Sequence, residues 1–72
     1  MKIREVFKRI ADEVFDGHYT VYKFTSNYYA NFGTVDARDA SVASEDFKGQ
    51  TEEEAMLKCI TAWVKEHQHG NW

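Results

Sequence analysis

The stretch HYTVYKFTSNYYANFGTV, residues 18–35, marks a change from a helical to an extended hydrophobic pattern. From residue 19 onward, aromatic and β-branched side chains alternate, which is typical of a β-strand, and neither face of this strand is clearly polar. A turn at Ser26–Asn27 separates this strand, expected at about 18–25, from a second strand at about 28–34. Gly33 weakens the second strand and indicates a bulge.

Two amphipathic helices flank the aromatic stretch. Apolar side chains at helical spacing predict the first helix over about 2–15, and Gly17 is the residue that ends it. The second helix is expected over about 52–67. It starts with the spacing of a capping box, in which the Thr51 hydroxyl accepts from the Glu54 amide while the Glu54 carboxylate reaches back.

The order of elements predicts a single α+β domain over residues 1–72. Residues 40–46 are interpreted as a short third strand, so the antiparallel sheet has two or three strands. Each helix has one apolar stripe, and both stripes are buried if the helices lie side by side on one sheet face, in two layers. The opposite face then stays open. Depending on register, it carries either Tyr19, Val21 and Lys23 or Thr20, Tyr22 and Phe24.

The composition excludes several classes of protein. A chain of 72 residues fills one small core, and it contains no apolar run near the roughly 20 residues of a membrane-spanning helix. The first residues carry interspersed charges, which argues against a secretory signal. Cys59 is the single cysteine, so an internal disulfide and a cysteine-based zinc cluster are excluded. These features favour a reducing compartment, the cytoplasm.

The residues with reactive side chains do not form a recognisable catalytic or metal motif. His67 and His69 are two apart, and on a helix such a pair points to different sides. Cys59 lies on the apolar face of the second helix, two turns from His67, and is expected to be core. His18 has no evident catalytic partner. We therefore expect no catalytic residue, no cofactor, no metal and no enzymatic activity.

The charge is distributed unevenly along the chain. Residues 36–54 hold seven acids against two bases, whereas the rest of the chain has a small positive excess and the whole chain a net charge of −3. Nucleic-acid binding is not expected, because Lys23 is the single basic residue within the aromatic stretch and phosphate contacts need clustered Lys and Arg. An acidic patch of this kind favours docking on a basic protein surface.

The region from Ser41 to Ala55 resembles the end of small phage-encoded proteins of unknown function. In these, a strand leads through an aromatic-x-Gly-x-Thr turn into a helix, and Phe47, Gly49, Thr51 and Ala55 match that pattern. The resemblance implies a phage or bacterial origin, with the host cytoplasm as the location for a phage protein. It carries no activity and no site residues.

Two functional hypotheses follow from these patterns. The first is a non-enzymatic protein–protein interaction module that uses its aromatic sheet face on a partner or in a homodimer. Its contact residues would be Tyr19, Tyr22, Tyr28 and Tyr29. The second is an acidic inhibitor or regulator that docks on a basic groove of a partner, of the type built for nucleic acid. Its contact residues would be Asp36, Asp39, Glu45 and Asp46.

Overall fold

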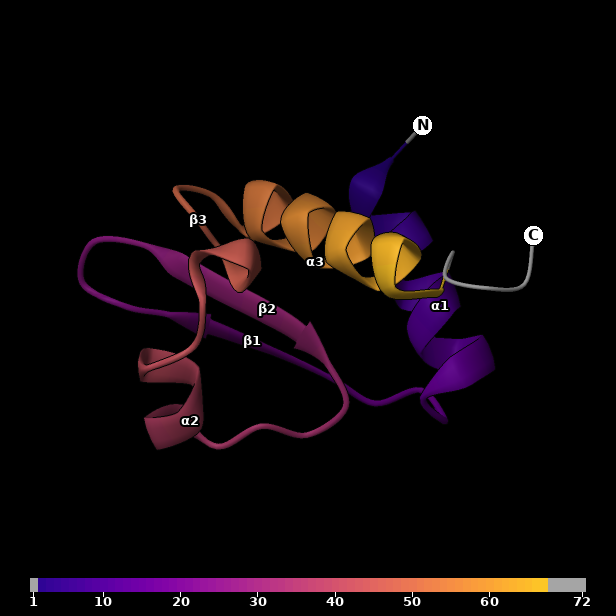
Figure 1. The fold of residues 1–72 in the computed structure, drawn as a ribbon, viewed down its shortest axis with the longest axis horizontal. Helices are drawn as coiled ribbons and strands as arrows, with labels where there is room; N and C mark the ends of the chain where they lie inside the picture. Colours follow the sequence, from indigo (N-terminus) through magenta and orange to yellow (C-terminus); the bar gives the residue numbers. More distant parts are fainter. Residues whose placement is uncertain (1, 68–72) are drawn as a thin grey trace.

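The structure, a computed structural model, describes residues 2–67 of the chain. Its elements are α1 (Ile3–Val14), β1 (Tyr19–Lys23), β2 (Tyr28–Phe32), α2 (Ala37–Ser41), the 3-10 turn η1 (Glu45–Phe47), β3 (Lys48–Gly49) and α3 (Glu52–His67) (Figure 1). The strands form one antiparallel sheet in the order β1–β2–β3. The expected α+β class is confirmed.

The first helix ends at the predicted place. Asp16 and Gly17 both have left-handed backbone conformations, with φ of 58° and 80°. The amide of Gly17 donates to the carbonyl of Ala11 at 2.8 Å, a bond that satisfies one of the last helix carbonyls. Glycine takes this conformation at little cost because it has no Cβ, so Gly17 turns the chain from α1 into β1.

The register of the β1–β2 hairpin decides which strand residues face the core. Tyr19 pairs with Phe32 and Lys23 with Tyr28, so residues paired across the strands share a face. One face carries Tyr19, Val21, Lys23, Tyr28, Ala30 and Phe32. The other carries Thr20, Tyr22, Tyr29 and Asn31.

Both long helices cover the first of these faces, as expected. The buried cluster there combines residues of α1, β2 and α3: Phe7, Ala11, Ala30, Phe32, Ala55, Met56 and Cys59. The ring of Phe32 stacks on that of Phe7 at 4.6 Å and on that of Phe15 at 4.9 Å. The core therefore relies on aromatic area to compensate for the small size of the domain.

The prediction of a strand over 40–46 is wrong. That stretch contains the end of α2, a loop and most of η1, and the third strand is the two-residue β3. Side-chain caps explain the difference. The Asp36 carboxylate accepts from the amide of Asp39 at 3.0 Å, and the Ser44 hydroxyl accepts from the amide of Asp46 at 2.9 Å. Each cap starts a helical turn, and local bonds of this kind compete with strand pairing.

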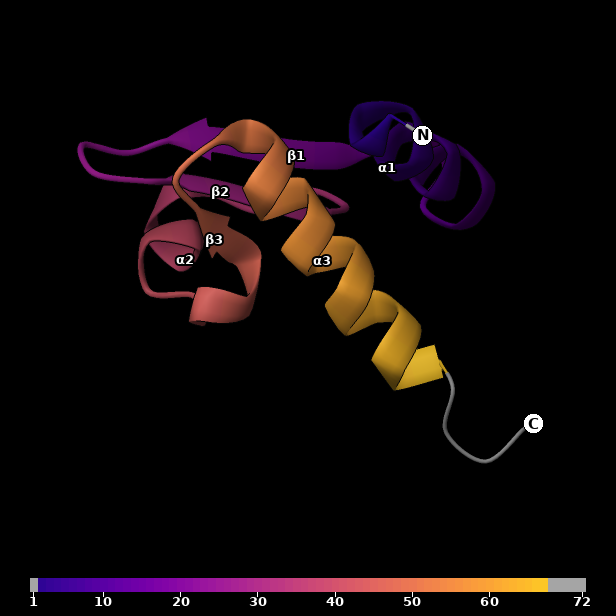
Figure 2. The ribbon, with the colours of Figure 1, turned by 90° about the horizontal axis from the view of Figure 1, so that it is seen from above.

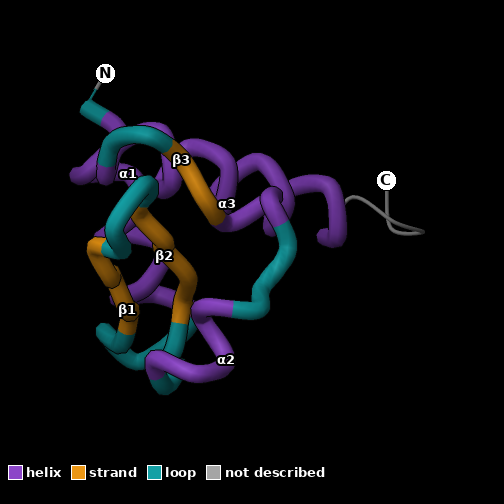
Figure 3. Tube along the Cα trace, turned by 90° about the vertical axis from the view of Figure 1, so that its left-hand side faces the viewer, coloured by secondary structure: helices purple, strands orange, loops and turns teal. Residues whose placement is uncertain are grey.

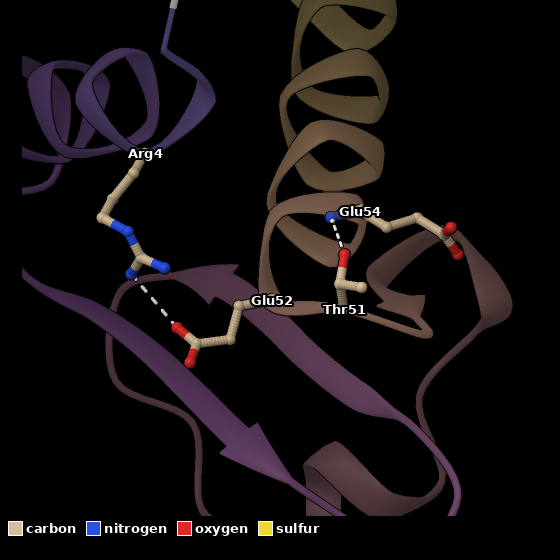
Figure 4. A network of polar contacts seen from close by, with 4 residues as sticks. All are labelled: Arg4, Thr51, Glu52 and Glu54. Atoms are coloured by element: carbon tan, nitrogen blue, oxygen red, sulfur yellow. Dashed lines mark hydrogen bonds and ion pairs between the residues drawn. The ribbon is translucent and has the colours of Figure 1, made fainter.

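The short third strand lies against the start of α3. A Cβ at Gly49 would meet the amide nitrogen of Ala55 at 2.7 Å, so glycine is required where β3 passes α3. The Thr51 hydroxyl accepts from the Glu54 amide at 3.0 Å, which confirms half of the capping box (Figure 4). The Glu54 carboxylate accepts instead from the amide of Gln50, at 3.1 Å.

An ion pair joins the two long helices at the surface. Arg4 Nη1 lies 3.1 Å from Glu52 Oε1, with both side chains about half exposed (Figure 4). Exposed pairs of this kind contribute about 0.2–1 kcal/mol, so packing of the apolar stripes accounts for most of the contact between α1 and α3. The pair also places the acidic first turn of α3 beside a basic side chain of α1.

Residues 33–47 cover the second sheet face, which the sequence analysis expected to be open. Tyr29 is 1% exposed and Ala40 is fully buried. The Tyr22 hydroxyl donates to the carbonyl of Val35 at 2.9 Å, which ties this segment to β1. In Figures 1 and 3, α2 lies on the opposite side of the sheet from α3.

Candidate functional site

The four tyrosines of the expected aromatic face are divided between the two sides of the sheet. Tyr19 and Tyr28 lie on the face covered by the long helices, where Tyr28 packs against the core and Tyr19 is 39% exposed. Tyr22 and Tyr29 lie on the other face, and Tyr29 is buried beneath Phe47 and the segment 33–47. The structure therefore does not bring the four side chains together on one open surface.

The four acidic residues of the second hypothesis are all exposed and lie in one continuous segment. Asp36 caps α2 through its bond to Asp39, whereas Glu45 and Asp46 lie on η1. Lys48 Nζ donates to the carbonyl of Ser41 at 3.0 Å and so connects the end of α2 to β3, next to η1. The structure therefore presents both acidic pairs from one segment, which the Tyr22–Val35 bond ties to β1 and the Lys48–Ser41 bond ties to β3.

The side chains considered for metal binding and catalysis lie apart. Among residues 2–67, no group of three or more His, Cys, Asp or Glu side chains could hold a metal ion. His18 is exposed in the loop before β1. The His67 ring lies against the Trp63 ring in a tilted arrangement, with centroids 4.4 Å apart, and its Nδ1 is 2.9 Å from the Trp63 carbonyl. His69 lies outside the described residues.

Cys59 is a core residue, as predicted. It is 1% exposed, and burial raises the pKa of its thiol to about 12, although a backbone hydrogen bond from Phe32 favours the thiolate. The thiol lies 3.6 Å from Asn31 Oδ1, to which it donates. A thiol that keeps its proton at neutral pH is a poor nucleophile.

The buried thiol predicts a loss of stability at alkaline pH. The unfolded chain releases the Cys59 proton near pH 9, whereas the folded chain releases it near pH 12. The free energy of unfolding therefore keeps its full value below pH 9 and decreases between pH 9 and pH 12. The expected slope is about 1.4 kcal/mol per pH unit. The pKa of Tyr29, raised chiefly by burial, adds a loss of the same sign above pH 10.

Urea unfolding between pH 7 and pH 11 measures this slope. The matched variant is Cys59→Ala, which is less stable at pH 7 because a buried side chain is truncated but should lose stability more slowly above pH 9. Equal slopes for the two proteins would contradict the assignment of a raised thiol pKa.

A hollow of about 250 Å³ lies under the second half of α3. It is lined by Phe15, Asn31, Phe32, Phe47, Cys59, Ala62, Trp63 and Glu66. Within the described residues Trp63 Nε1 has no hydrogen-bond partner, but this atom exposes less than 1 Å² to solvent. A molecule that enters the hollow from outside would not reach this donor. Trp63 Nε1 therefore does not provide a hydrogen bond for a ligand in the hollow.

A second hollow, of about 590 Å³, follows the outer surface of α1. Its described lining comes from that helix and the residue before it: Lys2, Glu5, Val6, Arg9, Ile10 and Glu13. Acidic and basic side chains alternate there around two half-buried apolar residues. This surface is typical of a solvated helix face with mixed charge.

A groove of about 340 Å³ runs between η1 and α3, and we call it the η1–α3 groove. Its lining residues are Glu45, Asp46, Leu57, Lys58, Thr61, Ala62 and Lys65. Glu45 and Asp46 of η1 share the groove with residues from Leu57 to Lys65, along the middle of α3. The second half of α3 extends past the sheet (Figure 2). The groove lining thus carries two acidic side chains from η1, Glu45 and Asp46, and two basic side chains from α3, Lys58 and Lys65.

Apolar side chains are exposed along this part of α3. Leu57, which lines the groove, is 46% exposed. Val64, on the same helix but not among the lining residues, is 38% exposed. Within residues 2–67, no carboxylate oxygen lies within 4.0 Å of the ammonium nitrogen of Lys58 or Lys65. In the same part of the chain, no basic nitrogen lies within 4.0 Å of a carboxylate oxygen of Glu45 or Asp46. The groove therefore combines exposed apolar area with charges that lack close ion-pair partners in the described part of the chain.

The sequence analysis did not predict this groove, although the positions of two apolar residues of α3 point to it. Leu57 and Val64 are apolar, but on the helical wheel they lie at or beyond the margin of the face formed by Met56, Cys59 and Trp63. A contiguous exposed apolar patch marks a contact surface, and such a patch forms where apolar residues outside the buried stripe lie on one face of a helix. The position of η1 beside it was not predicted, because 40–46 was interpreted as a strand.

The comparisons with known proteins identify no relative. No protein-family model, no curated protein and no solved structure matches the chain. The resemblance to small phage-encoded proteins therefore remains a prediction. None of the helices formed by residues 2–67 is long and apolar enough to cross a membrane.

Proposed function

We propose that the chain is a non-enzymatic protein-interaction module whose contact surface is the η1–α3 groove. The observation that carries this proposal is the exposure of Leu57 and Val64 beside four charged side chains without close ion-pair partners. Protein contacts combine an apolar centre with a polar rim, and this groove has both. The aromatic sheet face is set aside as the contact surface because Tyr29 is buried.

The state of Cys59 supports a binding role over catalysis. Its burial and raised thiol pKa make it inert, and the other candidate groups lie apart from it. A single buried cysteine is also what a reducing intracellular compartment permits, so we place the contact in the cytoplasm.

Site-specific photo-crosslinking in the cells that naturally produce the protein tests this proposal. A benzophenone amino acid replaces Leu57, in the groove, or Lys8, an exposed residue of α1 that serves as the matched control. We expect covalent protein adducts from position 57 and none from position 8 after illumination. Adducts at neither position, or equally at both, would overturn the groove as the contact surface.

The acidic-inhibitor hypothesis keeps one specific observation in its favour. Asp36, Asp39, Glu45 and Asp46 are exposed on a single segment. The Tyr22–Val35 hydrogen bond ties its start to β1, and the Lys48–Ser41 hydrogen bond ties its later part to β3. In this case position 39 would give the adducts in place of position 57, and binding would weaken strongly with added salt. An apolar contact at Leu57 depends less on salt, so the two functions are separable in one experiment.

A further inference from the structure

We propose that the outer edge of β1 pairs with β1 of a second copy of this chain, antiparallel and around a two-fold axis at Val21. The sheet has the order β1–β2–β3, so β1 is one of its edges, on the side of β2 away from β3 (Figure 3). The dimer joins the sheets of the two copies into one continuous sheet. This contact goes beyond the proposed function, because η1 leads into β3 at the other edge and the η1–α3 groove stays free.

The hydrogen bonds at the two ends of the β1–β2 hairpin show which backbone groups of β1 point outward. The amide of Gly33 donates to the carbonyl of His18 at 2.9 Å, and the amide of Phe24 donates to the carbonyl of Asn27 at 2.7 Å. Hydrogen-bonded pairs alternate along an antiparallel strand, so the even-numbered residues of β1 direct their amides and carbonyls toward β2. The odd-numbered residues direct theirs away from the sheet.

Three residues therefore present their amides and carbonyls at the edge: Tyr19, Val21 and Lys23. Within residues 2–67, none of these backbone groups has a hydrogen-bond partner. Edges of this kind are commonly protected by proline or by charged side chains along the strand. The chain has no proline, and Lys23, at the end of β1, is the single charged residue of this strand. The edge is thus open to another strand.

The edge is complementary to itself when two copies of β1 run in opposite directions. With the axis at Val21, Tyr19 of each copy lies opposite Lys23 of the other, and the two Val21 residues lie opposite each other. Each outward amide and carbonyl then gains a partner, and no like charges meet. An axis at Thr20 or Tyr22 would leave the backbone groups of one outward residue without a partner in the other strand.

The arrangement of the sheet favours a second copy over a strand from an unrelated protein. The other edge, β3, has two residues, so the described sheet offers one edge long enough for pairing. Two-fold pairing of that edge covers it in both copies at once and closes after two chains. In Figures 1 and 2, α1 lies at the end where β1 begins and does not run along the edge, so this helix does not occupy the place of a neighbouring strand.

Disulfide trapping of the purified full chain tests the two-fold axis. In an antiparallel hydrogen-bonded pair the Cα atoms are about 5.5 Å apart, within the range that a disulfide spans. We therefore expect Val21→Cys to form a disulfide-linked dimer under mild oxidation. Lys23→Cys is the matched control, because the two copies of residue 23 would be roughly 14 Å apart. The native Cys59 does not compete, since it is 1% exposed.

Sedimentation between about 1 µM and about 1 mM tests the edge itself, because this range covers weak protein contacts. We expect a concentration-dependent dimer for the unmodified chain. Lys23→Pro removes an outward amide and keeps the bonds between β1 and β2. Each dimer then loses two hydrogen bonds and should weaken at least about tenfold. Thr25→Pro, at an exposed position in the hairpin turn, should leave the dimer unchanged.

A monomer at every concentration would overturn the proposed dimer, and so would a Lys23→Pro variant that dimerises as well as Thr25→Pro. An untrapped Val21→Cys, or a Lys23→Cys trapped as readily, would place the contact or its register elsewhere and contradict the proposal. Circular dichroism shows whether each variant is folded, and the cysteine variants test the contact even if Lys23→Pro does not fold. A monomer that still forms adducts with another protein at position 57 would exclude the dimer and leave the proposed function intact.

Discussion

Replacing Phe7 with alanine is expected to destabilise the domain by about 3–5 kcal/mol. Phe7 is fully buried, stacks on Phe32 at 4.6 Å and meets Tyr19 edge-on at 5.4 Å. Its removal would leave a cavity where α1 meets the sheet. A domain of this length is stabilised by roughly 4–11 kcal/mol in total, so the variant would be close to unfolding at room temperature.

Urea unfolding followed by far-ultraviolet circular dichroism measures this effect. Phe7→Leu keeps most of the volume and should cost less than about 1.5 kcal/mol. Val14→Ala, on the same helix but half exposed, should change stability by less than about 0.5 kcal/mol. A Phe7→Ala variant as stable as Val14→Ala would show that α1 does not pack on the sheet in the way described.

Replacing Tyr29 with alanine is expected to cost a similar amount, about 3–5 kcal/mol. Tyr29 is 1% exposed and lies between the rings of Tyr22, at 6.3 Å, and Phe47, at 6.4 Å. Its hydroxyl accepts from Asn31 Nδ2 at 3.0 Å. The side chain therefore holds the segment 33–47 against the second sheet face, and the loss should be one of stability.

Two further variants separate the parts of this effect. Tyr29→Phe removes the hydroxyl and leaves Asn31 Nδ2 without that acceptor, which should cost about 1–3 kcal/mol in thermal or urea unfolding. Tyr19→Ala, at a 39% exposed position, should cost clearly less than Tyr29→Ala. If Tyr29→Ala unfolded at the same urea concentration as the unmodified chain, Tyr29 would belong to an open binding face after all.

The helices and their ends were predictable because local chemistry determines them. The helical spacing of apolar residues located α1 and α3, Gly17 located the end of α1, and Thr51 located the start of α3. The hairpin was equally local, with a turn before Tyr28. Each of these features depends on side chains within a few residues of one another.

The segment between the hairpin and α3 was misinterpreted for a reason visible in the sequence. Short polar residues at Asp36 and Ser44 are followed within three residues by amides that their side chains can bind. Such caps favour single helical turns, whereas the small residues around Ala40 suggested a strand. The corrected structure of this segment also changes the candidate site, because η1 forms one wall of the groove beside α3.

The α+β class, the two long helices, the hairpin and the burial of Cys59 were all predictable from local patterns, since periodicity and capping are properties of neighbouring residues. Only the three-dimensional arrangement shows which sheet face each tyrosine occupies, how residues 33–47 cover the second face, and that Glu45 and Asp46 share a groove with Leu57 and Lys65. These features depend on strand register and on contacts between distant segments. No local pattern specifies them, because a shift of one residue in register exchanges the two faces of a strand.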